Sequence, residues 1–429
     1  MAHNVALKRS STLCFNKGHI VPYKAKEDID NKGTIAVENK TSLITSWSIG
    51  ANRKRNRTLS EEERRNTLDV LWRGKLDSVD LKDIKTQVQV ISYNTKREIE
   101  RSSFEINQKI GSGNFGSVYK EEMNGLYGKN TKTLVAIKSL HTTTDLTQVD
   151  IFIDEIKIMS NLDPHLNLVN MIGSCTCEYI ARGELWLLLE FCTHGDLKKF
   201  LIENQPSLLL DSGESPLNTR CLLLWIYGIA QGMQYLAKHK IMHGDLAARN
   251  ILLSEDPFQS KFLLPKIADF GLSKKFHDNV RYNKELRPYV PWKWMAIEFL
   301  TKDFFTLKSD VWSFAVVVWE ILTFGREPYV NEKIETVIRK LEEGQRLPCP
   351  HECKSIRNWS SEKLYNELSI ACFDSDIMNR VSFTEVTMII EKELSPTEIE
   401  NHRQMNAFHQ FIRDSNYLEI RRHGAVQSK

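Results

Sequence analysis

The chain has 429 residues, enough for two lobes with accessory segments. Its 58 basic and 55 acidic side chains give a net charge of only +3, which excludes a charge-driven nucleic-acid or membrane-surface protein. The apolar runs are shorter than a membrane span and no leader-like segment opens the chain, so we expect a cytoplasmic protein without transmembrane insertion and without a nucleic-acid partner.

The first hundred residues are polar and of mixed charge, and we expect residues 1–100 to be partly disordered. The basic cluster Arg53–Arg57 is typical of a nuclear-import or anionic-lipid signal, or more simply of a solvated linker. Ser60 and Glu63 then have the spacing of a helix capping box. This spacing predicts a helix that runs to about Trp72.

A glycine-rich stretch, Gly111–Gly116, follows an apolar pattern that begins at Phe104. A dinucleotide-binding fold would continue into a helix, whereas Val118–Lys120 favours a strand. A hairpin of this kind can lie over phosphate groups and donate its backbone N–H groups to them. A glycine-rich hairpin that binds nothing would have the same sequence, so this stretch needs support from other motifs.

Lys138 ends the apolar strand that begins at Leu134, where a charge is costly unless it is paired. The next segment has apolar residues at helical spacing, and Glu155 lies beside that stripe, 17 positions after the lysine. We therefore expect Lys138 and Glu155 to pair. For either residue alone, a surface salt bridge is the simpler explanation.

A second apolar strand, Leu185–Cys192, leads into Gly195 and then into residues 204–219, whose composition predicts a loop. Asn218 is a candidate N-cap for the following helix. The residues expected on the buried face of that helix are Leu222, Ile226, Ile229, Met233 and Leu236.

The stretch His243–Asn250 places a carboxylate, a cation and an amide within eight residues, ahead of the apolar run Ile251–Leu253. Asp269, followed by Phe270 and Gly271, adds a second carboxylate. Carboxylate and amide oxygens are ligands that suit Mg²⁺. By contrast, Cys175 and Cys177 lack the CxxC spacing and nearby histidines of a typical zinc site, so we expect free thiols in a reducing compartment.

From about Phe104 to about residue 393 the chain resembles a protein tyrosine kinase. The motifs that carry the resemblance are Gly111–Gly116, Val135–Lys138, His243–Asn250, Asp269–Gly271 and Val290–Glu298. Residues 86–110 also resemble the segment ahead of the kinase domain in receptor tyrosine kinases of the fibroblast growth factor receptor type.

The resemblance implies an α+β, two-lobed protein kinase fold over residues 101–393. The smaller, β-rich N-lobe, with one regulatory helix, would reach to about residue 190, and the mainly helical C-lobe would follow. A polar tail would occupy residues 394–429. Within it, Tyr417 would resemble an SH2-domain ligand if phosphorylated, although an unmodified surface tyrosine is the simpler interpretation.

The resemblance also implies the catalytic roles. Asp245 would accept the proton of a tyrosine hydroxyl group, and Arg249 would support that carboxylate and the substrate. Lys138 would hold the α and β phosphates of ATP while Glu155 keeps it in place, and Asn250 and Asp269 would bind Mg²⁺. The other implied nucleotide contacts are Gly111, Ser112, Gly113, Asn114, Phe115, Gly116, Val118, Ala136, Leu189, Glu190, Cys192 and Leu252.

The implied activity is transfer of the ATP γ-phosphoryl group to tyrosine hydroxyls of protein substrates, because the lysine that serine/threonine kinases place two residues after the catalytic aspartate is absent. Three positions depart from the family pattern: Gly244 replaces an arginine, Ile297 a proline and Ala315 a glycine. These departures keep open a pseudokinase that acts as a nucleotide-binding scaffold. If the chain is active, the missing arginine predicts little dependence on phosphorylation of Tyr282.

Overall fold

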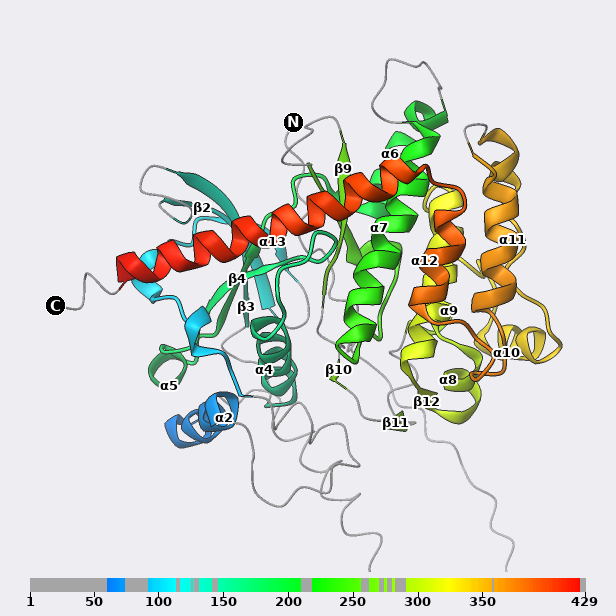
Figure 1. Cartoon of the computed structure of the whole chain (residues 1–429). Coiled ribbons are helices and arrows are strands. Elements are labelled where there is room, and N and C mark those ends of the chain that lie inside the picture. The colour runs from blue at the N-terminus through cyan, green and yellow to red at the C-terminus, as the bar shows by residue number, and fades with distance from the viewer. Residues whose placement is uncertain are drawn as a thin grey trace, which may run out of the picture.

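The computed structural model describes residues 60–73, 92–112, 116–124, 126, 131–140, 146–209, 218–255, 262–269, 274–275, 280–281, 291–356 and 359–424. These residues form a smaller lobe around an antiparallel sheet and a larger, mainly helical lobe (Figure 1). The predicted α+β, two-lobed architecture is therefore confirmed. Among the helices of these residues, none is at once long enough and apolar enough to cross a membrane.

The small lobe is organised by a five-stranded sheet in the order β1-β2-β3-β5-β4. The strands are β1 (Gln108–Ser112), β2 (Gly116–Asn124), β3 (Lys132–Leu140), β4 (Met171–Cys175) and β5 (Trp186–Glu190). Successive side chains of a strand point to opposite faces. Val135 and Ile137 of β3 accordingly pack in a small outer cluster with Trp186, whereas Ala136 belongs to the main core. The same alternation places Lys138 on the inner face.

Helix α4 (Leu146–Ser160) covers the inner face of the sheet and buries Val149, Phe152 and Ile156 in the main core. The capping box ahead of α2 (Glu61–Arg73) is present, since Glu63 N–H donates to Ser60 Oγ at 3.2 Å and Ser60 N–H donates to Glu63 Oε2 at 2.9 Å. Helix α2 packs on α4 and on α5 (Tyr179–Arg182). A helix ahead of the sheet in sequence thus supports the helix that carries Glu155.

The large lobe is built around α7 and α9, and the apolar periodicity of the sequence predicts the first of them. Asn218 caps α7 by accepting the N–H of Arg220, and the five residues expected on its buried face are all buried. The helices of this lobe are α6 (Leu197–Leu209), α7 (Thr219–Lys238), α8 (Ile297–Lys302), α9 (Leu307–Leu322), α10 (Ile334–Glu342), α11 (Ser361–Cys372) and α12 (Phe383–Glu391). Its short strands are β6 (Gly195–Asp196), β7 (Ile241–Met242), β8 (Ile251–Glu255), β9 (Leu263–Ile267), β10 (Lys274–Lys275), β11 (Val280–Arg281) and β12 (Phe304–Phe305).

Two segments differ from the sequence-based expectation. Residues 204–209, expected in a loop, continue helix α6, so Pro206 removes one helical hydrogen bond near the end without stopping the helix. The tail contains α13 (Pro396–Gly424), which runs from the helical lobe across to the sheet lobe (Figure 1). The basic cluster Arg53–Arg57 lies outside the described residues.

Helix α13 is held against the segment between α4 and β4. Leu166 N–H donates to Asn406 Oδ1 at 2.9 Å, and His402 Nε2 lies 2.8 Å from Asn167 Oδ1. The same segment pairs with the helical lobe, because Leu168 forms a parallel bridge with Ile267 of β9. The segment between α4 and β4, at the boundary between the lobes, is therefore bonded both to α13 and to β9.

Candidate active site

Lys138 and Glu155 meet as the sequence predicts. Lys138 Nζ lies 2.8 and 2.7 Å from the two carboxylate oxygens of Glu155, and 3.6 Å from Asp269 Oδ1. Burial lowers the pKa of Lys138, but the Glu155 and Asp269 carboxylates outweigh that effect, so its pKa lies above the ordinary value. A lysine that remains charged and is fixed between two carboxylates is suited to hold phosphate oxygens.

The loop before β8 fixes Asp245 from two sides. Arg249 contacts Asp245 Oδ1, and Asn250 Nδ2 donates to Asp245 Oδ2 at 2.8 Å and to its carbonyl oxygen at 2.7 Å. The Arg249 guanidinium also stacks 4.3 Å from the ring centroid of Trp294. Burial raises the pKa of Asp245 to about 6, although Arg249 partly offsets the effect. The carboxylate is thus ionised near neutral pH and can accept a proton.

The backbone of this loop is held by Asp310 of α9. His243 N–H and Gly244 N–H donate to the two Asp310 oxygens at 2.8 and 3.0 Å. Asp245 N–H donates to His243 Nδ1 at 3.2 Å, and His243 Nε2 lies 3.0 Å from the carbonyl oxygen of Ala268. Because a carbonyl can only accept, the His243 ring carries its proton on Nε2. This ring therefore joins the loop to the residue before Asp269.

Gly244 departs from the family pattern at a position where the backbone favours glycine. Its φ is +76°, in the left-handed region that other residues adopt only at a cost. Despite the missing arginine side chain, its N–H keeps the bond to Asp310. The substitution therefore leaves the support of this loop in place.

Asp269 and Asn250 are the residues that could hold a divalent cation. Ala268 N–H donates to the Asn250 carbonyl oxygen at 2.8 Å, which brings the two segments together. Asn250 bonds to Asp245 through Nδ2, so its side-chain oxygen remains the atom suited to a metal. The site carries one more negative than positive charge, from Asp245, Asp269 and Glu155 against Lys138 and Arg249. This net negative charge also favours a cation here.

The segment expected to contact adenine follows β5. Leu189 is buried and pairs with Ala136 of β3, and the N–H of Glu190 donates to the Asn170 carbonyl oxygen at 3.1 Å. A contact of Glu190 with adenine would therefore use its carbonyl oxygen. Cys192 is buried two residues later. Val118, Ala136 and Leu252, from β2, β3 and β8, belong to the same apolar core as Leu189.

Sequence reasoning missed a polar network at this segment. The Glu190 carboxylate accepts from Asn170 N–H at 2.8 Å and lies 2.9 Å from Lys266 Nζ. Asn170 Nδ2 in turn lies 3.1 Å from His409 Nε2 of α13. The signal in the sequence was Lys266, a lysine inside the apolar strand β9, which needs a partner as Lys138 does.

Glu320 is a second residue that the sequence analysis did not single out. It is buried in α9, and its Oε2 accepts from Ala248 N–H at 2.8 Å and from Trp294 Nε1 at 2.9 Å. It therefore positions both the loop before β8 and the ring beneath Arg249. A carboxylate within an otherwise apolar helix was the signal that could have identified it.

Glu298 and Arg380 form a buried ion pair. Two parallel bonds of 2.8 Å join them, and Ser309 Oγ donates to Glu298 Oε1 at 2.7 Å. Ile297 begins α8, and Ala315 is buried in α9. Both departures from the family pattern are thus accommodated in regular helices.

The glycine-rich stretch is described only at its two ends. Gly111, Ser112 and Gly116 lie on β1 and β2, where Gly111 pairs with Val118. The predicted residues outside the described ones are Gly113, Asn114, Phe115, Phe270, Gly271, Tyr282 and Val290. The backbone of Tyr417 lies in α13, but its side chain is also outside the described part.

Comparisons with known proteins agree with this geometry. The family description "Protein tyrosine and serine/threonine kinase" matches residues 104–390. The chain is 33% identical over 322 residues to a fibroblast growth factor receptor of Ciona intestinalis, which covers 72% of this chain and 41% of the receptor. It is also 33% identical over 315 residues to fibroblast growth factor receptor homolog 1 of Drosophila melanogaster, covering 70% of this chain and 39% of that protein.

A third relative is the tyrosine kinase receptor Cad96Ca of Drosophila melanogaster, 33% identical over 289 residues, or 66% of this chain and 35% of the receptor. The chain thus spans about two fifths of the length of these curated relatives.

Proposed function

The chain belongs to the protein tyrosine and serine/threonine kinase family, and from this premise we propose that it transfers the γ-phosphoryl group of ATP to tyrosine hydroxyl groups of proteins. One observation carries the proposal: Lys138, held by Glu155 and Asp269, and Asp245, held by Arg249 and Asn250, are joined through Ala268 and His243 into one site. Groups that bind phosphate and a group that accepts a proton thus lie on connected segments.

In this mechanism the protein mainly positions groups that are already charged. Lys138 orients the α and β phosphates, and Asp245 orients the hydroxyl group and takes its proton. Asn250 and Asp269 would hold Mg²⁺, which neutralises charge on the phosphates. Because Arg249 is fixed on Trp294, it keeps the Asp245 carboxylate turned toward the substrate hydroxyl without needing to rearrange.

Tyrosine is the proposed acceptor because the space two residues after Asp245 is occupied by Ala247, a small and fully buried residue. Serine/threonine kinases have a lysine at this position, and this chain does not. The proposed cation beside the substrate is instead Arg249. Phosphoamino-acid analysis of the labelled product tests this specificity, and label mainly on serine or threonine would contradict it.

The activity test uses the full chain, Mg-ATP and a glutamate–tyrosine copolymer. We expect the wild type to label the copolymer, and Asp245→Asn to lower the rate at least about a hundredfold, because the amide cannot accept the proton. Asp69→Asn, which changes an exposed aspartate of α2 in the same way, is the matched control and should keep the wild-type rate. Wild-type labelling no higher than that of Asp245→Asn would overturn the proposal.

The pseudokinase alternative rests on Gly244, Ile297 and Ala315. Gly244 adopts a backbone conformation suited to glycine, and the other two lie in regular helices, so none of them gives a specific reason to expect inactivity. We therefore favour catalysis. Nucleotide binding alone would not separate the two, since a pseudokinase can keep it, whereas the labelling assay does.

We further propose a cytoplasmic site of action, which rests on the use of ATP and on the dispersed cysteines, and an SH2-domain partner for phosphorylated Tyr417. Cell fractionation tests the first proposal. For the second, a phosphorylated peptide spanning 412–422 should retain isolated SH2 domains better than its Tyr417→Phe form. Equal retention by both peptides would exclude that partner.

A further inference from the structure

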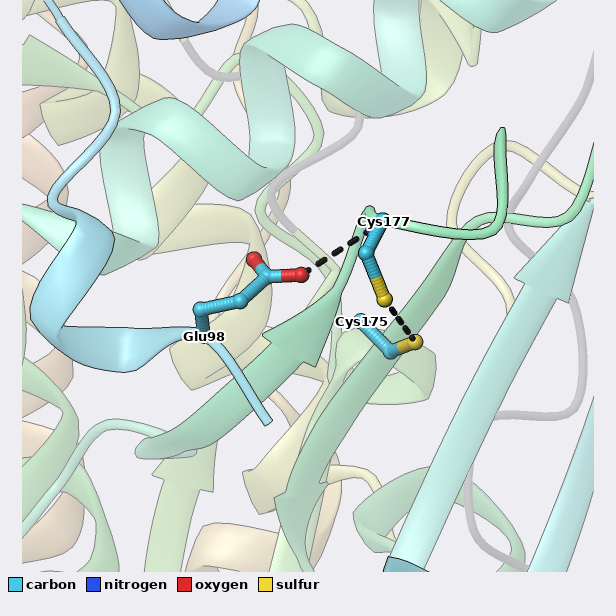
Figure 2. Close-up of side chains that lie close together, drawn as sticks. All are labelled: Glu98, Cys175 and Cys177. Carbon is cyan, nitrogen blue, oxygen red and sulfur yellow. Dashed lines mark hydrogen bonds between the residues drawn. The ribbon is translucent and has the colours of Figure 1, made fainter. Parts of the chain in front are cut away.

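Away from the active site, Glu98, Cys175 and Cys177 come together at the end of β4 (Figure 2). Glu98 belongs to the segment ahead of the kinase region and forms a parallel bridge with Ser174. One oxygen of Glu98 and the two sulfur atoms all lie within 4.8 Å of one another. Cys175 is buried and Cys177 is exposed, so the group reaches from the protein interior to solvent.

This group is held rigidly by the Glu98 carboxylate. Glu98 Oε1 accepts from Thr176 N–H at 2.7 Å and from Cys177 N–H at 3.1 Å. Glu98 Oε2 accepts from Thr176 Oγ1 at 3.0 Å and from Tyr93 OH at 2.9 Å. Because the backbone on both sides of Thr176 is fixed in this way, the two thiol groups are held on the same side of the chain.

The separation of the thiol groups fits a metal ion. Cys175 Sγ and Cys177 Sγ are 3.7 Å apart. Two thiolates bound to one zinc ion, with bonds of about 2.3 Å at a tetrahedral angle, lie about 3.8 Å apart. The sulfur atoms therefore need almost no movement to bind such an ion.

We propose that Cys175, Cys177 and Glu98 form a binding site for a soft divalent metal ion of the zinc class. Binding replaces the two thiol protons, which pass to solvent, so that M²⁺ and two thiols give a bis-thiolate complex and two H⁺. Glu98 supplies the third ligand atom by giving up the longest of its four hydrogen bonds, from Cys177 N–H at 3.1 Å. Water completes the tetrahedron from the exposed side of Cys177.

The sequence could not reveal this site. The spacing of Cys175 and Cys177 is not that of a typical zinc motif, and Glu98 lies 79 residues before Cys177. The sequence-based expectation of free thiols describes the metal-free protein. With metal bound, the segment ahead of the kinase region is tied to β4, which goes beyond the proposed function and does not depend on it.

The first test titrates the reduced full-length protein with Cd²⁺ and follows the ultraviolet thiolate-to-metal charge-transfer band. We expect a band that saturates at one equivalent of Cd²⁺ in the wild type and is lost, or needs at least about a hundredfold more Cd²⁺, in Cys177→Ser. Cys349→Ser, which alters a cysteine elsewhere in the chain, is the matched control and should keep the wild-type titration. Absence of the band in the wild type, or an unchanged titration in Cys177→Ser, would refute the site.

The second test measures Tm with and without Zn²⁺. Since an ion that binds only the folded state stabilises it, Zn²⁺ should raise the Tm of the wild type but not that of Cys177→Ser. Cys177 is exposed, so this variant should keep the wild-type Tm without metal. Glu98→Gln should weaken Zn²⁺ binding about tenfold or more, because a neutral amide replaces the carboxylate ligand. Equal Zn²⁺ shifts in all three proteins would contradict the proposal.

Discussion

Asp245 is the residue on which the proposed chemistry depends, and its environment sets its proton affinity. Burial raises its pKa to about 6, from an ordinary value near 4, while Arg249 limits the rise. A carboxylate must be ionised to accept a proton. Protonation of Asp245 should therefore remove activity at a pH where an exposed aspartate would still be ionised.

We accordingly expect kcat/KM for the tyrosine copolymer to fall as pH decreases through about 6. Arg249→Ala should lower the rate and also move the midpoint of this fall upward, since the cation that favours the ionised form is gone. The pH–rate profiles of the two proteins measure both effects. A wild-type profile that stays flat down to pH ~4.5, below the raised pKa, would contradict the assignment.

Gly244 permits a second prediction at this scale. With a φ of +76°, Gly244→Ala should lower the free energy of unfolding by about 1–2 kcal/mol and reduce kcat by displacing the neighbouring Asp245. Gly344→Ala is the control: its φ is +85° and a methyl group there meets nothing within 4 Å, so it should lose similar stability but no activity. Urea denaturation and kcat of both variants give the comparison.

The absence of an arginine at position 244 also bears on regulation. A phosphate on Tyr282 lacks the charge-assisted partner that such an arginine supplies, so Tyr282→Phe should keep kcat/KM within about twofold of the wild type. Peptide phosphorylation by the two proteins measures this. Loss of activity in Tyr282→Phe would show that another group recognises the phosphate.

At the residue scale, the sequence was informative where the chemistry lies within one contiguous stretch. Asp245, Arg249 and Asn250 are neighbours in sequence, and the structure brings them into contact. Glu320 and Lys266 were missed because their partners lie far along the chain, 72 residues away for Ala248 and 100 for Leu166. Sequence periodicity shows that such residues are buried but not what they contact.

Among the elements, α8 and α9 are linked to the end of the helical lobe by one buried ion pair. Arg380 is fully buried and Glu298 is 4% exposed, so removing one charge leaves the other without its partner in the interior. Arg380→Ala should lower the free energy of unfolding by about 3–5 kcal/mol. The exposed pair of Lys392 and Glu367 is the control. Lys392→Ala should change the free energy of unfolding by less than about 1 kcal/mol. Similar losses would show that the buried pair is not specifically stabilising.

Helices with strong apolar periodicity could be predicted at this scale, and polar ones could not. Helices α4 and α7 have apolar stripes and match their expected positions. Helix α13 is mostly polar and is held by individual side chains such as His402 and Asn406, for which sequence periodicity gives no signal. The continuation of α6 past Pro206 was missed for a related reason, since composition favoured a loop.

For the whole molecule, α13 connects parts that belong to different lobes. It satisfies polar groups of Leu166, Asn167 and Asn170, next to β4, and its first turn is joined to α7 by Arg220 and Glu398. The Asn170 contact extends through Glu190 to the strand that leads into the proposed adenine site. The last helix is therefore part of the domain rather than an appendage.

The double variant Asn406→Ala, His409→Ala should lower the free energy of unfolding by about 1–3 kcal/mol, because it leaves polar groups of the segment between α4 and β4 without these partners. Arg403→Ala is the control, since Arg403 is exposed and pairs with Glu400 of the same helix. Urea denaturation measures both. A double variant as stable as Arg403→Ala would show that α13 does not support this boundary.

The contacts of α13 also decide when the protein can finish folding. Asn406 and His409 contact residues that precede them by 240 and 239 positions. Nearly the whole N-lobe has therefore left the ribosome long before the α13 residues that bond to it are synthesised. The sheet and α7 can form during synthesis, but the segment that joins the two lobes reaches its final bonds only after residue 409 has left the exit tunnel. A translation pause late in the message would thus expose an incomplete domain to chaperones and proteases.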